Sequence, residues 1–387
     1  MLAKNIIACL MFIPEKIQLN PQAYLKCAVC GEEYPLELRY RCQACDGGVL
    51  NVVYSSTQTL KSGSGLSRFE DFVPIQPLPE FDCPETPLIR LDNPQYVDHD
   101  GIYCKVEGAL ATGNTKYRQS CMATPGLLWG GVKEFVVSST GNSSSSFMYW
   151  AKKLEGLIRL HVFVPSTHRH RLKFDNPYAT IHETNVDFVE TGKLAKEYAL
   201  ENNLFWEGGF FNFFRREGLK TGYMEGATQL DFQVDVVFQP ISSGMGFYGG
   251  YFGFKQLLAN GYIEKMPRFV AVQQDTCPPV YTAFHSDREQ IADEDIVRNP
   301  KGKAEAILRG NPTASYPYLR DLILETQGTV VAPTQAELLE SYEILQETGI
   351  SACHTAALSL AACKKLIVDG WISSSEKCLL MLTGGRS

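Results

Sequence analysis

Four cysteines near the amino terminus have the spacing of a metal site. Cys27 and Cys30 form one Cys-x-x-Cys pair, and Cys42 and Cys45 form a second pair after an eleven-residue spacer. Each pair can fold as a tight turn, and two facing turns give the tetrahedral cage of four thiolates that zinc prefers. With all four positions filled by protein, such a zinc would be structural and would stabilise a segment too short to form a core. Two unrelated thiol pairs, reduced or disulfide-linked, are the alternative.

Two polar loops farther along the chain have residue types that could hold a charged ligand. The first is Thr112-Gly113-Asn114-Thr115-Lys116, which ends on a lysine. A lone lysine in such a place is more often a solvated surface charge. The second is Ser138-Ser139-Thr140-Gly141-Asn142-Ser143-Ser144. Its hydroxyls and free amides would lie at a helix N-terminus, where the helix dipole favours an anion such as a carboxylate. A serine-rich cap for that helix explains the second loop equally well.

A third polar loop indicates that all three loops bind the same ligand. Ser242-Ser243-Gly244-Met245-Gly246 follows an expected strand and opens the next helix, so its small residues and free amides could cradle a phosphate. Short Gly/Ser loops are common, and this one alone is a weak signal. Three such loops at strand ends in one chain predict a single ligand that carries both a phosphate and an amino-acid carboxylate.

The elements that would position these loops alternate along the chain. From Thr86 onward, β-branched runs alternate with amphipathic stretches, which predicts an α/β fold. The expected strands are Phe135 to Ser138, Leu160 to Val164, Val234 to Gln239, Arg268 to Val272 and Leu379 to Leu382. The expected helices are Ser144 to Leu154, Lys193 to Asn202, Gly246 to Asn260 and Thr334 to Glu347.

Length and composition limit the classes of function. The chain has 387 residues, 44% of them hydrophobic, which is enough for two or three structural units. A net charge of -7, with both signs well mixed, predicts neither a nucleic-acid partner nor a membrane-binding face. The apolar run from Ile6 to Ile13 is shorter than the roughly 20 residues that span a bilayer and lacks a cleavage pattern. We expect it to form a pairing strand or a packed helix. Eight scattered cysteines besides the four paired ones fit a reducing cytoplasm better than secretion.

Taken in order, these motifs resemble a known group of enzymes. Thr86-Pro87-Leu88, followed by the three polar loops, is similar to the pyridoxal phosphate enzymes of fold type II. The four-cysteine segment, ending Gly48-Val49-Leu50-Asn51-Val52-Val53-Tyr54, narrows the resemblance to threonine synthases and the related cysteate synthases. Further matching segments are Arg216-Glu217-Gly218-Leu219-Lys220-Thr221 with Glu225 and Gln229, Gly310-Asn311-Pro312, Thr348-Gly349-Ile350 and Leu382-Thr383-Gly384-Gly385. The resemblance covers residues 24 to 385.

The resemblance implies roles for individual residues. Lys116 would hold pyridoxal phosphate as a Schiff base and, once freed by substrate, move protons to and from the amino-acid carbons. Asn142 would bond the phenolic oxygen of the cofactor, and Thr383 would face its pyridine nitrogen. The substrate carboxylate would be held by Ser139, Thr140 and Ser143. The cofactor phosphate would be held by Ser242, Ser243, Gly244, Met245 and Gly246.

The resemblance also implies an organisation of the chain. Residues 1–56 would form an amino-terminal segment with the four-cysteine module. The Ser/Gly-rich stretch from Ser55 to Ser67 itself predicts a linker, which we place at residues 57–84. Residues 85–120 and 226–387 would form a large cofactor-binding domain, and residues 121–225 a small mobile domain. The cofactor would lie in the cleft between the two domains. A homodimer is the family expectation.

Two reactions on a small amino-acid substrate fit the resemblance. One is that of threonine synthase, which converts O-phosphohomoserine to threonine and phosphate. The other is β-replacement on O-phosphoserine or a similar amino acid by sulfite or another nucleophile, as in cysteate synthase. The run Asn114-Thr115-Lys116-Tyr117-Arg118-Gln119, where the family commonly has Ser-Phe-Lys-Asp-Arg-Gly, favours the second. A catalytically silent relative that binds a ligand is the third hypothesis. The basic cluster from His168 to Arg171 would meet the leaving phosphate or form a solvated loop.

Overall fold

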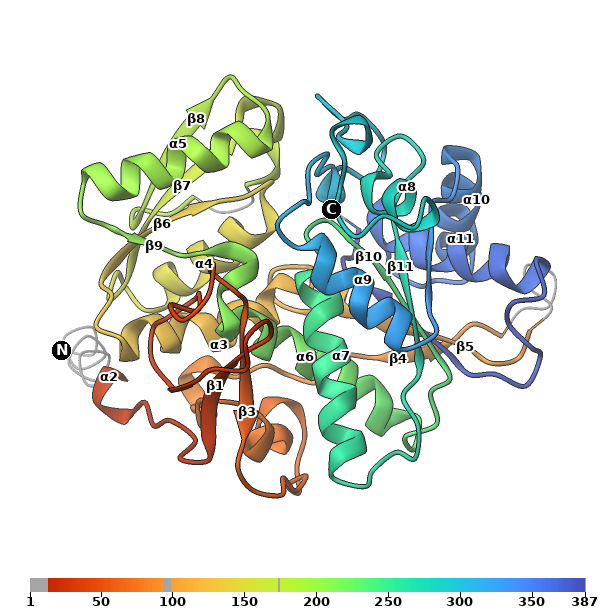
Figure 1. Ribbon diagram of the computed structural model, residues 1–387, viewed down its shortest axis with the longest axis horizontal. Helices are drawn as coiled ribbons and strands as arrows, with labels where there is room; N and C mark the ends of the chain where they lie inside the picture. Colours follow the sequence, from red (N-terminus) through yellow and green to blue (C-terminus); the bar gives the residue numbers. More distant parts are fainter. Residues whose placement is uncertain (1–12, 93–98, 173–174, 387) are drawn as a thin grey trace. The chain divides into compact units, whose positions relative to one another are not determined.

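The computed structural model describes residues 13–92, 99–172 and 175–386 (Figure 1). The chain forms two compact units, each built from two stretches of sequence. Unit 1 contains residues 1–84 and 116–218, and unit 2 contains residues 85–115 and 219–387. The expectation for the apolar run from Ile6 falls outside the described residues except at Ile13, where helix α2 (Ile13–Lys16) begins. Among the helices described, none has the length and apolar character needed to cross a membrane.

The amino-terminal part of unit 1 is a three-stranded antiparallel sheet with the order β2-β1-β3. Its strands are β1 (Ala23–Cys27), β2 (Glu33–Pro35) and β3 (Leu50–Tyr54). The pairing of β1 with β3 sets Cys27 opposite Leu50, so the first cysteine pair begins where β1 ends. The four-cysteine segment is therefore anchored on a small sheet of its own.

The segment 57–84, expected to be a linker, is packed rather than free. It contains the 3-10 helices η1 (Gly65–Phe72) and η2 (Pro79–Phe81). Phe69, Phe72 and Phe81 are each 1% exposed or less. The Ser/Gly-rich composition of its first part gave no indication of these buried rings, which pack the segment into unit 1.

The rest of unit 1 is a parallel sheet with the order β8-β7-β6-β9, flanked by helices. Its strands are β6 (Glu134–Ser138), β7 (Arg159–Pro165), β8 (Ala179–Thr184) and β9 (Phe205–Trp206). Its helices are α3 (Lys116–Trp129), α4 (Asn142–Lys153) and α5 (Phe188–Glu201), with the 3-10 helices η4 (Ser166–Arg171) and η5 (Gly209–Phe211). Helix α5 packs on β6 and β7 through Ala195 and Ala199, which lie against Val136 and Phe163.

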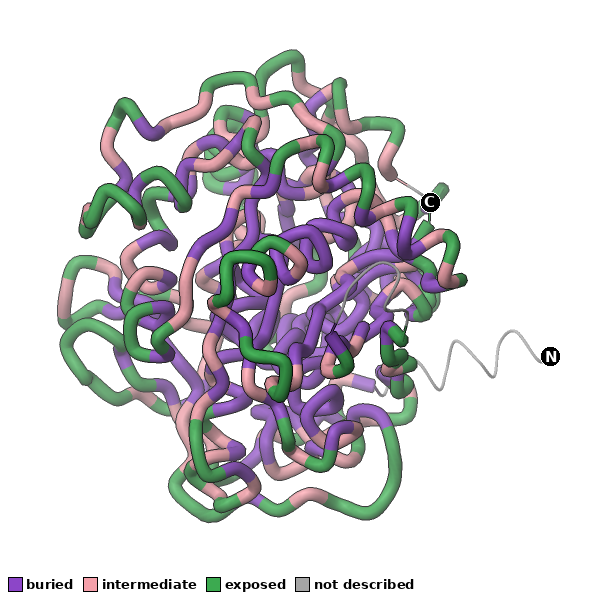
Figure 2. Tube along the Cα trace, turned by 90° about the vertical axis from the view of Figure 1, so that its right-hand side faces the viewer, coloured by how far each residue is buried: buried purple, intermediate pink, exposed green. Residues whose placement is uncertain are grey.

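Unit 2 is built on a six-stranded sheet with the order β12-β11-β10-β13-β5-β4. Its strands are β4 (Leu88–Arg90), β5 (Ile102–Val106), β10 (Val236–Pro240), β11 (Arg268–Val272), β12 (Thr329–Val331) and β13 (Cys378–Leu382). All neighbours are parallel except β4, which pairs antiparallel with β5. β10 and β13 are buried along their whole length, as expected of parallel strands covered on both faces. Buried residues are drawn in purple in Figure 2.

Helices connect the strands of unit 2. They are α7 (Met245–Ala259), α8 (Pro279–His285), α9 (Tyr316–Glu325), α10 (Gln335–Glu347) and α11 (His354–Val368), with the 3-10 helices η3 (Glu107–Ala109), η6 (Asp293–Asp295) and η7 (Glu305–Ile307). Helix α6 (Phe213–Gln229) is continuous across the sequence boundary between the units at Gly218. The expected α/β class is confirmed, and each of the expected strands and helices is present within a few residues of its expected ends.

Helices α3 and α6 approach each other at two glycines. A Cβ atom on Gly126 would lie 2.6 Å from the ring of Phe214, and one on Gly218 would lie 2.2 Å from the carbonyl oxygen of Arg118. The second contact is with backbone, which cannot move aside as a flexible side chain can. Glycine at position 218 is therefore what allows the start of α3 to lie against α6.

Replacing this glycine is expected to destabilise the protein. Gly218→Ala forces α3 and α6 apart and should lower the free energy of unfolding by about 1–3 kcal/mol, measured by urea denaturation. Gly192→Ala is the matched control, because Gly192 is also helical but a Cβ at that position would come no closer than 3.9 Å to Ser138 Oγ. That variant should gain about 0.5–1 kcal/mol. Equal effects of the two substitutions would show that the close approach is unimportant.

Candidate functional site

Lys116 is the first residue of α3, and the pKa of its amine is lowered. The side chain is half-buried. Burial and the positive charge of Arg215 lower the pKa of Lys116 from 10.5 to about 8. Only a neutral amine is a nucleophile, so this shift enlarges the reactive fraction near neutral pH. Lys116 thus has the properties of a lysine that attacks a carbonyl carbon.

Arg215 itself is held by a buried carboxylate. Its Nε and Nη2 atoms donate to the two carboxylate oxygens of Glu207, and both residues are nearly inaccessible, at 3% and 1% exposure. The Nδ2 atom of Asn212 donates to Glu207 Oε1 over 2.7 Å. Burial raises the pKa of Glu207, and the charge of Arg215 opposes that rise. This bidentate pair fixes the guanidinium that acts on Lys116.

Neither Arg215 nor Glu207 was predicted from the sequence. The segment that matches the family begins at Arg216, one residue too late to include Arg215. Glu207 precedes Arg215 by eight positions in an irregular stretch, where no periodic pattern links the two. Two consecutive arginines within a largely apolar run were the only signal that could have indicated a buried charge there.

The loop between β6 and α4 exposes a helix N-terminus. Ser139 Oγ accepts hydrogen bonds from the amides of Gly141 (2.9 Å) and Ser144 (3.1 Å). Gly141 caps α4 with a φ of 117°, which favours glycine. The first backbone bond of α4 is from Ser145 to Gly141, so the amides of Asn142 and Ser143 precede it. Ser139 therefore organises the loop, and Thr140, Asn142 and Ser143 of the same loop are half-buried.

In unit 2, the loop between β10 and α7 has the form of an anion cradle. Gly244 caps α7 in a left-handed conformation with a φ of 73°, and a Cβ there would lie 2.5 Å from Leu319. The first backbone bond of α7 is from Tyr248 to Gly244 over 2.8 Å, so the amides of Met245 and Gly246 precede it. These amides, with half-buried Ser242 and Ser243 beside them, suit a phosphate at the positive end of a long helix.

Thr383 lies beside the segment that leads to Lys116. The amide of Thr115 donates to the carbonyl oxygen of Thr383 over 2.9 Å, and Asn114 forms a bridge with Gly384. Lys116 is the next residue in the chain after Thr115. The half-buried side chain of Thr383 is thus carried on backbone that is paired with the polar loop preceding the lysine.

A buried ion pair supports the same part of unit 2. Lys105 on β5 is fully buried, and its Nζ donates to the carbonyl oxygen of Thr86 (2.7 Å), Glu225 Oε1 (2.5 Å) and Gln229 Oε1 (2.8 Å). Thr86 Oγ1 in turn donates to Glu107 Oε1 over 2.9 Å. Glu107 opens the 3-10 helix that precedes the polar loop, so this network fixes where the loop begins.

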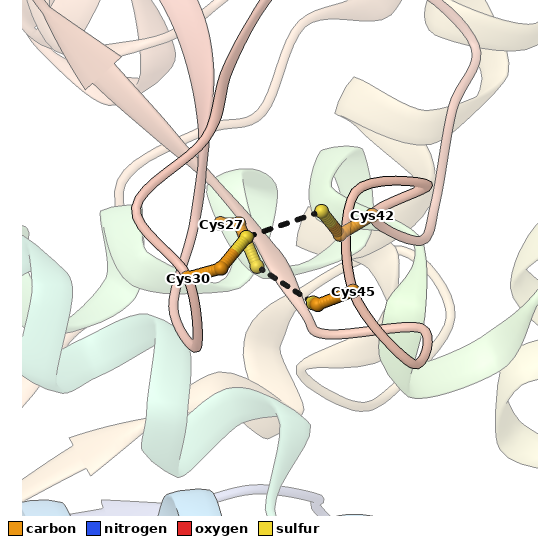
Figure 3. A group of neighbouring side chains, drawn as sticks. All are labelled: Cys27, Cys30, Cys42 and Cys45. Carbon is orange, nitrogen blue, oxygen red and sulfur yellow. Dashed lines mark hydrogen bonds between the residues drawn. The ribbon is translucent and has the colours of Figure 1, made fainter.

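The four paired cysteines come together as predicted. Their sulfur atoms all lie within 4.8 Å of one another, with 3.7 Å between Cys27 and Cys45 and 3.5 Å between Cys30 and Cys42 (Figure 3). A Cβ on Gly48 would lie 2.7 Å from the sulfur of Cys27, so glycine leaves room for the cluster. Four converging thiols fit the tetrahedral shell of a structural zinc.

Comparison with known proteins decides the family. A family model described as pyridoxal-phosphate dependent enzyme matches residues 81–384. The chain belongs to this family. It is an enzyme of the lyase and synthase kind that uses pyridoxal phosphate, and enzymes of this family act on small amino-acid substrates. The family and cofactor predicted from the sequence are confirmed.

Curated relatives and solved structures agree with the family. The chain is 28% identical to a threonine synthase of Methanocaldococcus jannaschii over 93% of this chain and 91% of that protein. It is 26% identical to a cysteate synthase of Methanosarcina barkeri with the same shares covered. The structure of maize serine racemase superposes with a TM-score of 0.64 at 18% identity, covering 78% of this chain and 88% of that one. The fold is that of the fold type II enzymes of the family.

The roles of the individual residues stay predictions. The structure places Lys116, Ser139, Thr140, Asn142 and Ser143 in unit 1. It places Ser242, Ser243, Gly244, Met245, Gly246 and Thr383 in unit 2. In each unit they lie in loops or first helical turns, and the starts of α4 and α7 have amides that precede the first helical backbone bond. The residues present therefore fit the cofactor of the family.

We expect the cysteine cluster to hold about one zinc ion per chain, since its four thiols complete a tetrahedral shell. Metal analysis of the purified protein measures this, and Cys45→Ser should lose most of the zinc and lower the thermal midpoint. Cys353→Ser is the control, because Cys353 lies outside the cluster. Zinc retained in full by Cys45→Ser would contradict a four-thiol site.

Removing the cation of the buried pair in unit 2 should be costly. Lys105→Met leaves the carboxylate of Glu225 buried without this lysine and should lower the free energy of unfolding by about 3–5 kcal/mol. The double variant Lys105→Met/Glu225→Gln removes the charge as well and should recover part of that loss. Urea denaturation of the three proteins at one pH tests this, and a single variant as stable as wild type would show that the pair is not needed.

Proposed function

We propose that this enzyme catalyses the threonine synthase reaction, in which O-phosphohomoserine and water give threonine and phosphate. The observation that carries the proposal is the lysine at the start of α3 with a pKa of about 8, joined directly to a loop that pairs with the Thr383 segment. The match of nearly the whole chain to a threonine synthase supports it. In the reaction the carbon–oxygen bond to phosphate breaks, and the oxygen of water adds to the β-carbon.

The residues of this chain would divide the work. Bound pyridoxal phosphate supplies an electron sink for charge that develops on the amino-acid carbons. Lys116 would hold the cofactor and, when substrate releases it, carry protons between those carbons. The start of α4, with Ser139, Thr140 and Ser143, would hold the substrate carboxylate, and Asn142 would bond the phenolic oxygen of the cofactor.

Other residues would bind other parts of the cofactor. The loop from Ser242 to Gly246 would hold its phosphate through amides at the start of α7. Thr383 would meet the pyridine nitrogen with a neutral hydroxyl, which leaves the nitrogen without a full positive charge and suits elimination and replacement. The homodimer expected from the resemblance stays a prediction.

A second reaction is supported by the comparisons. Several cysteate synthases match 93% of the chain at 24 to 26% identity. Tyr117, which follows the lysine where the family commonly has aspartate, is buried and donates to the carbonyl oxygen of Asp82 over 3.0 Å. This departure next to Lys116 favours β-replacement on O-phosphoserine or a similar amino acid, with sulfite or another nucleophile in place of water. The retained lysine argues against the third hypothesis, a silent relative.

Visible absorption of the purified protein separates these hypotheses. We expect wild type to be yellow and Lys116→Ala to lose covalently held cofactor, because that amine makes the bond. O-phosphohomoserine and O-phosphoserine are then added separately, and the true substrate should shift the band and release phosphate.

The outcome also selects between the two reactions. A response to O-phosphohomoserine alone supports the threonine synthase reaction, and a response to O-phosphoserine alone supports β-replacement. A wild type that stays colourless after incubation with pyridoxal phosphate would refute the role of Lys116 and leave the silent relative as the leading hypothesis.

A further inference from the structure

The four-cysteine segment contacts α6 on both sides of Arg215. On one side, the ring of Tyr40 lies 6.2 Å from that of Phe213, edge to face. On the other, Arg216 Nη2 donates to the carbonyl oxygen of Leu50, at the start of β3. The hydroxyl of Tyr54, at the end of β3, lies 2.9 Å from Glu217 Oε2. Phe214 and Arg215 are therefore the two residues that these contacts enclose along the helix.

Residues between the two cysteine pairs also contact the end of α3 and the turn before α6. We call residues 36–41, the second part of the eleven-residue spacer, the spacer segment. A Cβ on Gly208 would lie 2.5 Å from the ring of Tyr40, and one on Gly130 would lie 1.8 Å from Leu38 Cδ1. The guanidinium of Arg41 lies 3.4 Å from the ring centroid of Phe211. The spacer segment is thus seated on the end of α3 and on the turn that leads into α6.

The position of Tyr40 protects the pair formed by Glu207 and Arg215. Tyr40 packs edge to face on Phe205, with ring centroids 5.7 Å apart, and directly on the backbone of Gly208 next to Glu207. The hydroxyl oxygen of Tyr40 is itself buried, and the ring covers the chain beside Glu207 and Arg215, which are 1% and 3% exposed. Water that entered here would weaken the field of Arg215 at Lys116.

The position of α6 constrains the start of α3, because the two helices are in direct contact. Gly218 lies against the carbonyl oxygen of Arg118, two residues after Lys116, and Gly126 lies against Phe214. A shift of the first turns of α6 would therefore move the guanidinium of Arg215 relative to the amine of Lys116. The contact chain from cysteine cluster to lysine lies entirely within unit 1.

We propose that the four-cysteine module, when it holds its metal, positions Arg215 beside Lys116 by clamping the first turns of α6 and excluding water from the Glu207–Arg215 pair. Tyr40 is the positioning residue that carries the effect. The module then sets the reactivity of the lysine as well as adding stability. This inference rests on the proposed attachment of pyridoxal phosphate to Lys116.

The test is the pH dependence of cofactor uptake by the full chain freed of pyridoxal phosphate, followed by visible absorption and by trapping with borohydride. In wild type the rate should rise through a midpoint near 8, the pKa of Lys116. Tyr40→Ala opens the pair to water, so the midpoint should move up by roughly half a unit or more, toward the ordinary value for lysine. Removal of zinc from wild type should move it in the same direction.

Two further variants make the result specific. Tyr24→Ala is the matched control, because Tyr24 lies on β1 of the same small sheet, and it should keep the wild-type midpoint. Tyr54→Phe loses one hydroxyl and keeps its ring, so it tests the clamp where Tyr40→Ala lowers stability. It should give a smaller upward shift than Tyr40→Ala. A role in stability alone would lower the amount of active protein without moving the midpoint.

The results distinguish a positioning role of the module from a purely stabilising one. Upward shifts in Tyr40→Ala and in zinc-free protein, with none in Tyr24→Ala, support the inference. A folded Tyr40→Ala and a folded Tyr54→Phe that both keep the wild-type midpoint overturn it and leave the module a stabilising element only. Lys116→Ala separates the two proposals: if it still traps cofactor covalently at the wild-type rate, the proposed attachment fails and the inference falls with it.

Discussion

The close packing of α3 on α6 is the constraint on which the rest of unit 1 depends. At Gly218 the backbone of one helix meets the backbone of the other, and no side chain larger than hydrogen can enter between them. Since α3 begins with Lys116 and α6 carries Arg215, this contact brings two cations into one region where water is scarce. Electrostatic repulsion there is unfavourable for folding. This repulsion is tolerated because both carboxylate oxygens of Glu207 accept hydrogen bonds from Arg215. Arg215 therefore stays charged, and Lys116 is the group that is more easily deprotonated.

The two loops proposed to bind anions have the same backbone geometry, although they lie in different units. At α4 and at α7 a glycine with a positive φ ends the strand connection and starts the helix, so the first amides point away from the helix body. At α4 the hydroxyl of Ser139 also orients the loop, because it accepts hydrogen bonds from the amides of Gly141 and Ser144. Both loops are preorganised by backbone geometry, which changes little when side chains near a substrate are exchanged. This explains how members of one fold can act on different amino acids while they hold the same cofactor.

Much of this arrangement could be predicted from the sequence, because it is local. The strands from Phe135, Leu160, Arg268 and Leu379, the helices that follow the polar loops, and the four-cysteine cluster all rest on short patterns. The packed state of residues 57–84 was not predicted, since Phe69 and Phe72 directly follow a Ser/Gly-rich stretch whose composition is that of a loop. Nor was the pair of Glu207 and Arg215, because their contact depends on how an irregular segment turns before α6. The effect of Arg215 on Lys116 required knowing that two helices far apart in sequence lie together.

The order of strands in unit 2 has a consequence for how the protein is made. Strand β13 lies between β10 and β5 in the sheet, yet it is the last of the described strands to be synthesised. At about 5–20 residues per second, β5 waits for some tens of seconds on the ribosome before its neighbour exists. Unit 1 is complete in sequence by Gly218 and has time to fold first. Until β13 exists, the edge of β5 that it covers in the folded protein keeps unpaired backbone N–H and C=O groups, which are open to pairing with another strand.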